Sequence, residues 1–207
     1  MDASDWDERY AGSDLVWSTG PNVWVRELCS PLPAGRALDV AAGEGRNALW
    51  LVERGWTVTA ADYSPVAVSR IRQIAAERFD ARARLRLEAV VADATLPAPG
   101  TAYDLVLFSY LHLPREEWAR AVAAGVDATA VGGLVVVVAH ARRNLTEGVG
   151  GPQDAAILLD PEDVLATVAH LPVAVELAQL RARDVEGAPR PALDSVVTLR
   201  RTDHPHG

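Results

Sequence analysis

Hydrophobic positions follow two alternating patterns along the chain from residue 36 onward. Short apolar runs predict β-strands at residues 36–41, 57–61, 85–91, 103–109 and 133–139. Longer stretches with apolar residues near helical spacing predict helices at 47–54, 66–79 and 115–129, and another helix opens at Asp160-Pro161. This alternation is typical of an α/β protein in which helices cover both faces of a parallel sheet.

The C-terminal region departs from this alternation. Residues 173–181 and 195–200 read as two strands, and the connection between them carries Gly187, Pro189 and Pro191 in place of a helix. Strands joined without a crossover helix pair antiparallel. We therefore expect a doubly wound, mostly parallel sheet of seven strands that ends in an antiparallel hairpin at its edge.

The length of 207 residues, 49% of them hydrophobic, suits one domain with one substantial core. We expect a helical cap at 1–33, the α/β core at 34–201 and a tail at 202–207. The N-terminus lacks the layout of a signal peptide, and no apolar run reaches the roughly 20 residues of a membrane span. We therefore expect a cytoplasmic protein without a membrane partner.

Charge and composition exclude several kinds of chemistry. A net charge of −8 disfavours nucleic acid, because a surface that binds phosphates needs clustered positive charge. All twenty basic residues are arginine, which removes lysine Schiff-base chemistry. The arginines between Arg70 and Arg86 are mixed with Glu77, Asp80 and Glu88 and are expected to form a solvated face. Cys29 is the only cysteine, and we expect neither a disulfide nor a metal site.

A glycine-rich turn follows the first predicted strand. Gly43 and Gly45 lie between that strand and the next helix, where free backbone N–H groups favour a polar or anionic ligand. Asp39 is a carboxylate within an apolar strand, and its burial requires a hydrogen bond or a positive charge. This combination predicts a small-molecule site.

Two more acids follow the next strands. Asp62 ends the second strand, where a carboxylate can accept both hydroxyls of a ribose, although it could instead cap the helix after Ser64-Pro65. Asp93 follows the third strand. Because the carboxyl ends of parallel strands share one edge, we expect Asp39, Asp62 and Asp93 to face one crevice.

The run Leu38-Asp39-Val40-Ala41-Ala42-Gly43-Glu44-Gly45 resembles the first motif of class I methyltransferases, and the chain looks closest to small bacterial enzymes related to tellurite-resistance and thiopurine methyltransferases. Ala41 replaces the usual first glycine, which is tolerated if its backbone stays in an ordinary region. The resemblance implies S-adenosylmethionine as cofactor, without a metal. It also implies these cofactor-binding positions: Asp39, Ala41, Gly43, Gly45, Arg46, Asp62, Tyr63, Ser64, Asp93, Ala94 and Ser109.

Methyl transfer requires mainly orientation of the reactants. A thiolate or a reduced chalcogen acceptor needs no general base, whereas a hydroxyl or a protonated amine needs one. His112, just after the fourth strand, is our candidate base. Tyr10, Trp17, Tyr110, His140 and Asn144 are candidate substrate contacts.

The predicted reaction is methylation of a small molecule. Two alternatives remain open, an NAD-dependent oxidoreductase, which the spacing Gly43-x-Gly45-x-x-Ala48 permits, and a non-catalytic protein that binds the methyl donor. The glycine-rich stretch at 144–156 could hinge a lid or form a surface turn.

Overall fold

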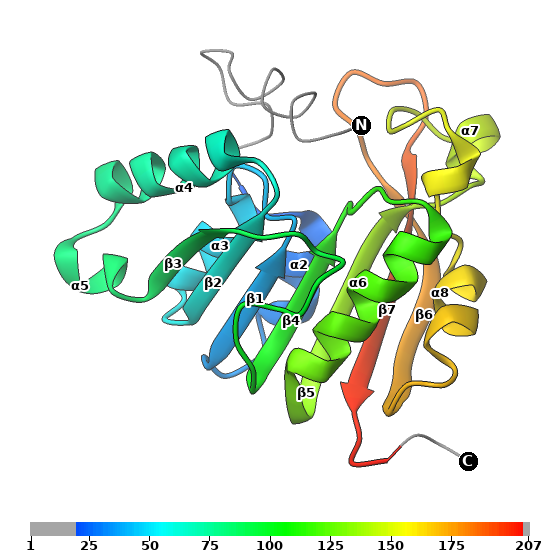
Figure 1. Ribbon diagram of the computed structural model, residues 1–207. Coiled ribbons are helices and arrows are strands. Elements are labelled where there is room, and N and C mark those ends of the chain that lie inside the picture. The colour runs from blue at the N-terminus through cyan, green and yellow to red at the C-terminus, as the bar shows by residue number, and fades with distance from the viewer. Residues whose placement is uncertain (1–19, 205–207) are drawn as a thin grey trace.

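A computed structural model describes residues 20–204 of the chain and contains one seven-stranded sheet (Figure 1). The strands lie in the order β3-β2-β1-β4-β5-β7-β6, and all pairs are parallel except those that involve β7. This confirms the predicted doubly wound sheet and its antiparallel hairpin. The strands are β1 (Arg36–Val40), β2 (Thr57–Asp62), β3 (Leu87–Val91), β4 (Tyr103–Ser109), β5 (Thr129–His140), β6 (Val173–Arg183) and β7 (Ala192–Arg201).

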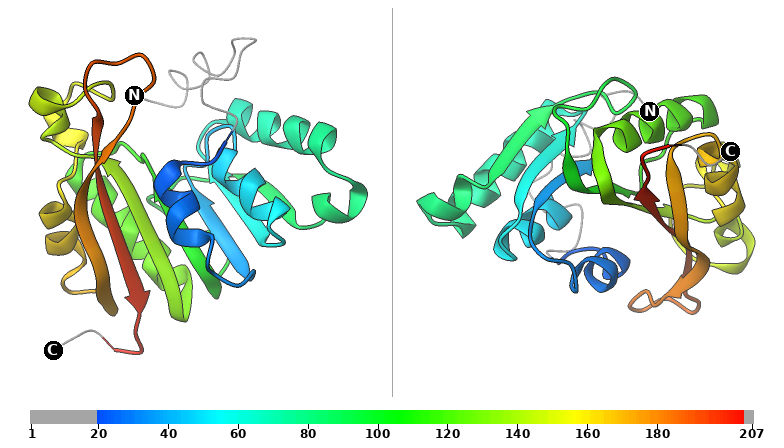
Figure 2. Two further views of the ribbon diagram at one scale, coloured as in Figure 1. Left: turned by 180° about the vertical axis from the view of Figure 1, so that it is seen from behind. Right: turned by 90° about the horizontal axis from the view of Figure 1, so that it is seen from below.

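Helices cover both faces of the sheet (Figure 2). One face carries α2 (Val23–Cys29), α3 (Arg46–Glu53) and α4 (Pro65–Arg78), and the other carries α6 (Arg115–Ala128) and α8 (Pro161–Val168). Short helices complete the described chain at α5 (Ala81–Arg84), α7 (Asn144–Glu147) and the 3-10 turn η1 (Ala155–Ile157).

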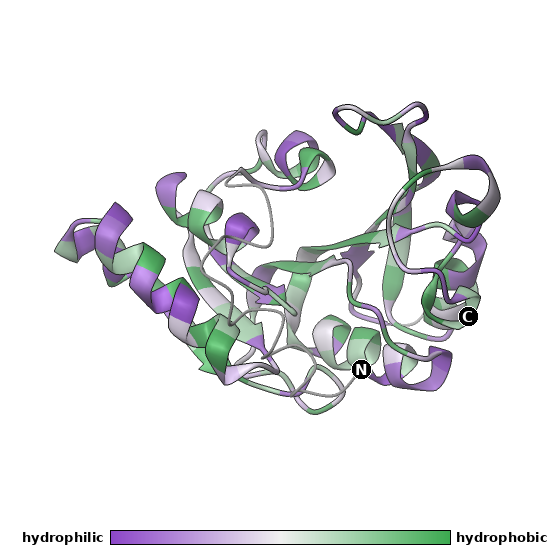
Figure 3. Cartoon of the chain, turned by 90° about the horizontal axis from the view of Figure 1, so that it is seen from above, coloured by the Kyte–Doolittle hydropathy of each residue, from purple (hydrophilic) through white to green (hydrophobic). Residues whose placement is uncertain are grey.

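The two faces build two hydrophobic clusters with the sheet between them. Trp56 and Ile71 belong to the cluster under α2, α3 and α4, while Phe108 and Trp118 belong to the cluster under α6 and α8. The strand residues alternate between the two clusters because successive side chains point to opposite faces. Seen from above, hydrophobic residues follow the strands through the middle of the molecule and hydrophilic residues lie mainly on the outer helices (Figure 3).

Local sequence signals fix several helix ends. Pro65 opens α4, and the side-chain oxygen of Ser64 accepts the N–H of Ala67 at 3.1 Å, as the predicted cap requires. Asp160 and Asp163 cap α8 reciprocally.

Cys29 is fully buried in α2, where burial raises the pKa of its thiol to about 12, so it is a packing residue.

The starts of β3 and β5 differ from the sequence-based prediction. The stretch at 81–86 forms α5 and a turn, so β3 begins at Leu87 and Leu85 is 87% exposed. An N-cap at Asp80, whose side chain accepts the N–H of Ala83, explains this helix. β5 begins at Thr129 and includes two glycines, because its first residues pair with Tyr103 of β4.

The arginines from Arg70 to Arg86 divide into two groups. Four of them are exposed as expected, but Arg70 is partly buried and pairs with Glu44, and Arg86 donates to the carbonyl of Val52.

None of the helices in residues 20–204 combines the length and apolar character that a membrane crossing requires. Across the same residues, no three His, Cys, Asp or Glu side chains gather where they could hold a metal ion.

Candidate functional site

The strand register brings the predicted site residues to one edge of the sheet. Asp62 ends β2, Ser109 ends β4 and His140 ends β5, and all three line a single cavity. Its volume of about 1000 Å³ lies at the upper end of typical ligand pockets. It opens where the strand order reverses between β1 and β4, the usual ligand position in an open α/β sheet.

The turn between β1 and α3 forms one wall of the cavity. Its backbone has positive φ at Ala41 (55°), Gly43 (57°) and Gly45 (83°). Gly45 also packs closely on Ile71, since a Cβ atom at position 45 would lie 2.9 Å from Ile71 Cγ1. The glycines therefore serve a tight turn and a close helix contact, and Gly43 itself borders the cavity.

Ala41 corrects one expectation. We expected an ordinary backbone at this position, but its φ of 55° lies in the left-handed region, which costs an L-residue about 1–2 kcal/mol. Alanine stands here where the methyltransferase pattern has glycine, and it borders the cavity. The turn thus holds a strained residue beside the site.

Replacing Ala41 with glycine should therefore raise the free energy of unfolding by up to about 1 kcal/mol, because relief of strain exceeds the entropy that glycine adds to the unfolded chain. Urea denaturation measures this difference. Ala42, the next residue, has no positive φ and provides the control. Ala42→Gly should lower the unfolding free energy, and equal effects of the two changes would contradict the strain argument.

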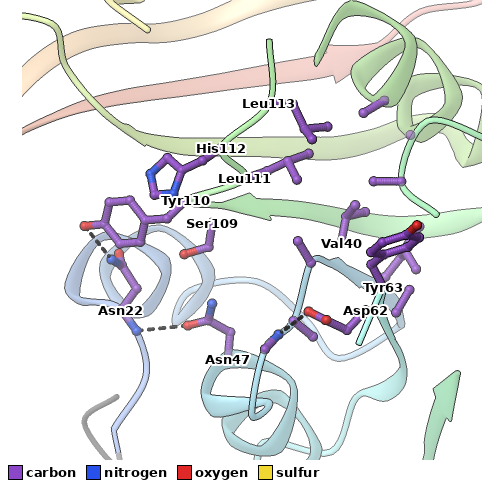
Figure 4. A pocket seen from close by; sticks show the side chains of 18 of the residues that line it. Asn22, Val40, Asn47, Asp62, Tyr63, Ser109, Tyr110, Leu111, His112 and Leu113 are labelled. Carbon is purple, nitrogen blue, oxygen red and sulfur yellow. Dashed lines mark hydrogen bonds between the residues drawn. The ribbon is translucent and has the colours of Figure 1, made fainter. Parts of the chain in front are cut away.

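Asp62 ties the turn to β2 (Figure 4). One carboxylate oxygen accepts the N–H of Gly43 at 2.7 Å, and the other accepts the N–H of Ser64 at 2.9 Å. Asp62 is 8% exposed and lines the cavity. Each carboxylate oxygen can accept more than one hydrogen bond, so Asp62 can hold the turn and a ligand hydroxyl together.

Asp39 lies behind the turn and does not line the cavity. It is 1% exposed, and its Oδ2 accepts the N–H of Ala48 at 3.1 Å. Within residues 20–204, its Oδ1 has no hydrogen-bond partner. Burial raises the pKa of Asp39 to about 7, the charge of Asp62 adds to the rise, and the Ala48 N–H and Arg46 oppose it. Gly45 and Ser64 also lie outside the cavity lining.

The far end of the cavity carries the residues expected to contact an adenine. Tyr63 is 52% exposed with its ring beside the cavity, and Ala94 lines the same region. Asp93 borders the cavity and accepts both the N–H and the hydroxyl of Thr95 at 2.8 Å.

Ser109 Oγ is buried and has no hydrogen-bond partner among the described residues, so the cavity offers it to a ligand.

Three aromatic residues form a stack at the other end of the cavity. The Tyr110 ring lies 4.4 Å from that of His140, and the His112 ring lies 5.6 Å from His140 and nearly parallel to it. The guanidinium of Arg46 lies 5.8 Å from the centre of the Tyr110 ring. Asn22 caps α2 and donates to the Tyr110 hydroxyl at 3.2 Å (Figure 4).

Asp194 of β7 is a buried carboxylate at the site that no sequence pattern predicted. It is fully buried, and its Oδ2 accepts hydrogen bonds from Trp24 Nε1, the Tyr110 hydroxyl and Arg183 Nε at 2.8–2.9 Å. Burial raises the pKa of Asp194, but the neighbouring His140, Arg183 and Trp24 outweigh burial and hold the pKa below its usual value. Asp194 precedes the strand predicted at 195–200, so the alternating pattern neither placed its side chain on a face nor gave it a partner.

Two candidate substrate contacts are not among the described residues, and a third does not line the cavity. Tyr10 and Trp17 lie outside the described residues. Asn144 is buried behind the cavity, where its amide donates to the carbonyls of Val149 and Gly150 and accepts the N–H of Leu193. Asn144 therefore fastens the glycine-rich loop to β7.

Known proteins resemble this chain in sequence over part of its length. Residues 37–133 match the family described as a methyltransferase domain. Hemagglutinin 1 of Eikenella corrodens is 34% identical over 82 residues, which are 40% of this chain and 26% of that protein. The chain thus spans about a quarter of the length of this curated relative.

Solved structures share the fold at low sequence identity. A protein studied for the conversion of a disulfide bond into a thioacetal group during echinomycin biosynthesis has a TM-score of 0.75, 21% identity and coverage of 97% of this chain and 90% of its own. The glycopeptide N-methyltransferase MtfA, complexed with S-adenosylmethionine, has a TM-score of 0.67 and 20% identity. The match covers 86% of this chain and 92% of MtfA. TehB from Haemophilus influenzae has a TM-score of 0.69 and 16% identity, and the match covers 95% of this chain and 66% of TehB.

The matched residues include the glycine turn and the ends of β1 to β4, and the remaining strands complete the seven-stranded sheet. The expected likeness to a tellurite-resistance protein is confirmed by TehB. Residues 37–133 therefore match a methyltransferase domain, and the chain has the fold of the N-methyltransferase MtfA.

Proposed function

We propose that the chain binds S-adenosylmethionine in the cavity at the carboxyl edge of the sheet and transfers its methyl group to a small molecule. The observation that carries the proposal is the combination of Asp62 and the Gly43 backbone on one wall of a cavity of about 1000 Å³. Acceptors with a thiol, chalcogen, hydroxyl or amine group all belong to this proposal.

The residues around the cavity fit this cofactor. Asp62 suits the ribose hydroxyls, the exposed ring of Tyr63 suits an adenine face, and Ser109 Oγ is a buried polar atom in need of a partner. MtfA, which has this fold, has been crystallised with S-adenosylmethionine. The bound cofactor supplies a methyl group on a positively charged sulfur, which becomes a neutral thioether when a nucleophile takes the methyl.

The protein contributes positioning to this reaction. The strained turn at Ala41 and Gly43 brings backbone groups against the ligand without side chains in the way. The apolar wall of Val40 and Leu111 excludes water from the middle of the cavity (Figure 4). The remaining volume accommodates an acceptor beside the histidines.

Calorimetric titration with S-adenosylmethionine and S-adenosylhomocysteine tests the proposal. We expect both to bind, and we expect Asp62→Ala to weaken binding roughly 10- to 150-fold, because each lost hydrogen bond to a charged group contributes about 1.5–3 kcal/mol. Asp80→Ala is the control, since Asp80 also accepts a backbone N–H but lies outside the cavity. Binding of NAD together with no binding of either sulfur compound would revive the oxidoreductase alternative.

A further inference from the structure

The strand register places a buried carboxylate opposite a cavity histidine. His140 ends β5, and Asp194 is its direct partner on the antiparallel strand β7. His140 Nδ1 lies 3.3 Å from Asp194 Oδ1. His140 lines the cavity with a side chain that is 12% exposed, whereas that of Asp194 is fully buried.

The surroundings of Asp194 assign its two oxygens to different tasks. Oδ2 accepts all three hydrogen bonds, from Trp24, Tyr110 and Arg183. Neither Oδ1 nor His140 Nδ1 has a hydrogen-bond partner among the described residues, and the two atoms face each other at 3.3 Å. A carboxylate beside Nδ1 favours the tautomer with its proton on Nδ1, which leaves the lone pair of Nε2 available.

The glycine-rich loop packs against the Nε2 edge of the His140 ring through a residue without a side chain. A Cβ atom at Gly151 would lie 2.9 Å from His140 Cδ2 and 3.1 Å from Nε2, so any side chain here would crowd this edge of the ring. Asn144 holds the preceding carbonyl groups of this loop. The loop is therefore fixed against His140 at a residue without a side chain.

We propose that His140 is the general base of the reaction and that Asp194 positions it, so that the acceptor is a hydroxyl or an amine that must lose a proton. This inference rests on the proposed function and narrows its substrate class. In the Michaelis complex the acceptor's X–H bond breaks and its proton goes to His140 Nε2. The freed electron pair forms the bond to the methyl carbon, and the carbon–sulfur pair stays on sulfur.

Other charged and titratable groups around His140 are compatible with this role. The Asp194 carboxylate balances the charge of the imidazolium. Burial raises the pKa of Tyr110, which keeps its proton and donates a hydrogen bond to Asp194. Arg183 and Arg46 lie over the Tyr110 ring. His112 stacks on His140.

Long-range ¹H–¹⁵N spectra of the full chain test the dyad without any acceptor. His140→Gln identifies the His140 signals. We expect the Nδ1–H tautomer in the wild type and a shift towards Nε2–H in Asp194→Asn, with the other histidines unchanged. A wild-type His140 protonated on Nε2, or a tautomer that Asp194→Asn does not alter, would overturn the proposal. A merely structural role for Asp194 would not move the tautomer.

Access to Nε2 is tested by diethyl pyrocarbonate, which acylates accessible neutral imidazoles, followed by mass spectrometry. Gly150 and Gly151 form a matched pair, because both have positive φ but a Cβ at Gly150 meets nothing within 4 Å. We expect modification of His140 in the wild type and in Gly150→Ala, and at least tenfold slower modification in Gly151→Ala. Equal rates in both variants would contradict a role for Gly151 in keeping the Nε2 edge of His140 accessible.

Labelled S-adenosylmethionine with catechol, phenethylamine or thiophenol tests the reaction. We expect label in catechol or phenethylamine, with kcat/KM falling about 10²- to 10⁴-fold in His140→Gln and the acidic limb of its pH profile lost. Label in thiophenol alone, or an unaffected His140→Gln, would overturn the inference. Failure of the proposed function is distinct, because the wild type would then not bind S-adenosylmethionine in the calorimeter.

Discussion

Asp194→Ala should lower the free energy of unfolding by about 3–5 kcal/mol, because removal of one partner leaves the other buried polar groups uncompensated. The carboxylate is fully buried and accepts hydrogen bonds from Trp24, Tyr110 and Arg183. These donors come from α2, from the end of β4 and from β6, so the loss would loosen three elements that meet beside the cavity. Urea denaturation followed by circular dichroism measures the change.

The control is an exposed arginine–carboxylate pair on the same two strands. Glu176 of β6 accepts two hydrogen bonds from Arg200 of β7, and both side chains are more than a third exposed. Solvent screens such pairs, so Glu176→Ala should cost less than about 1 kcal/mol. Similar losses in the two variants would show that burial of Asp194 contributes nothing beyond the surface pair.

Much of the fold follows from local patterns that the sequence displays. The valine-rich run after Gly133 can only be a central strand, and Pro65 after Ser64 fixes the start of α4. The edge of the sheet that holds the cavity follows from the parallel order of the first five strands. Asp62 and Ser109 were predicted at this edge because each ends a strand whose boundary the apolar pattern defines well.

The remainder of the site depends on contacts between distant residues. Asp194 meets His140 because β7 pairs antiparallel with β5 in one particular register, which no periodicity specifies. The left-handed backbone of Ala41 contradicts the propensity of alanine, since the surrounding turn overrides it. Asn144 was placed at the substrate by its position after β5, but its side chain turns to the loop backbone.

Asp39 should make the stability of the protein fall as pH rises. Burial raises its folded pKa from 3.8 to about 7, so the folded state holds a proton that the unfolded chain releases above about pH 4. The stabilisation is fully present below pH 3.8 and is lost as pH rises through about 7. This difference between the folded and unfolded pKa of Asp39 corresponds to about 4 kcal/mol in the free energy of unfolding. Asp39→Asn keeps an oxygen for the Ala48 N–H but has no proton to lose.

Urea denaturation of the wild type and of Asp39→Asn between pH 4 and pH 8 measures this coupling. The two proteins should have similar unfolding free energies near pH 4, where Asp39 is neutral, and the variant should become more stable by a few kcal/mol near pH 8. Parallel curves would mean that the buried carboxylate is ionised throughout this range. Its charge would then be stabilised by Arg46 and the Ala48 N–H strongly enough to offset burial, and the second oxygen of Asp39 would require a partner within the fold.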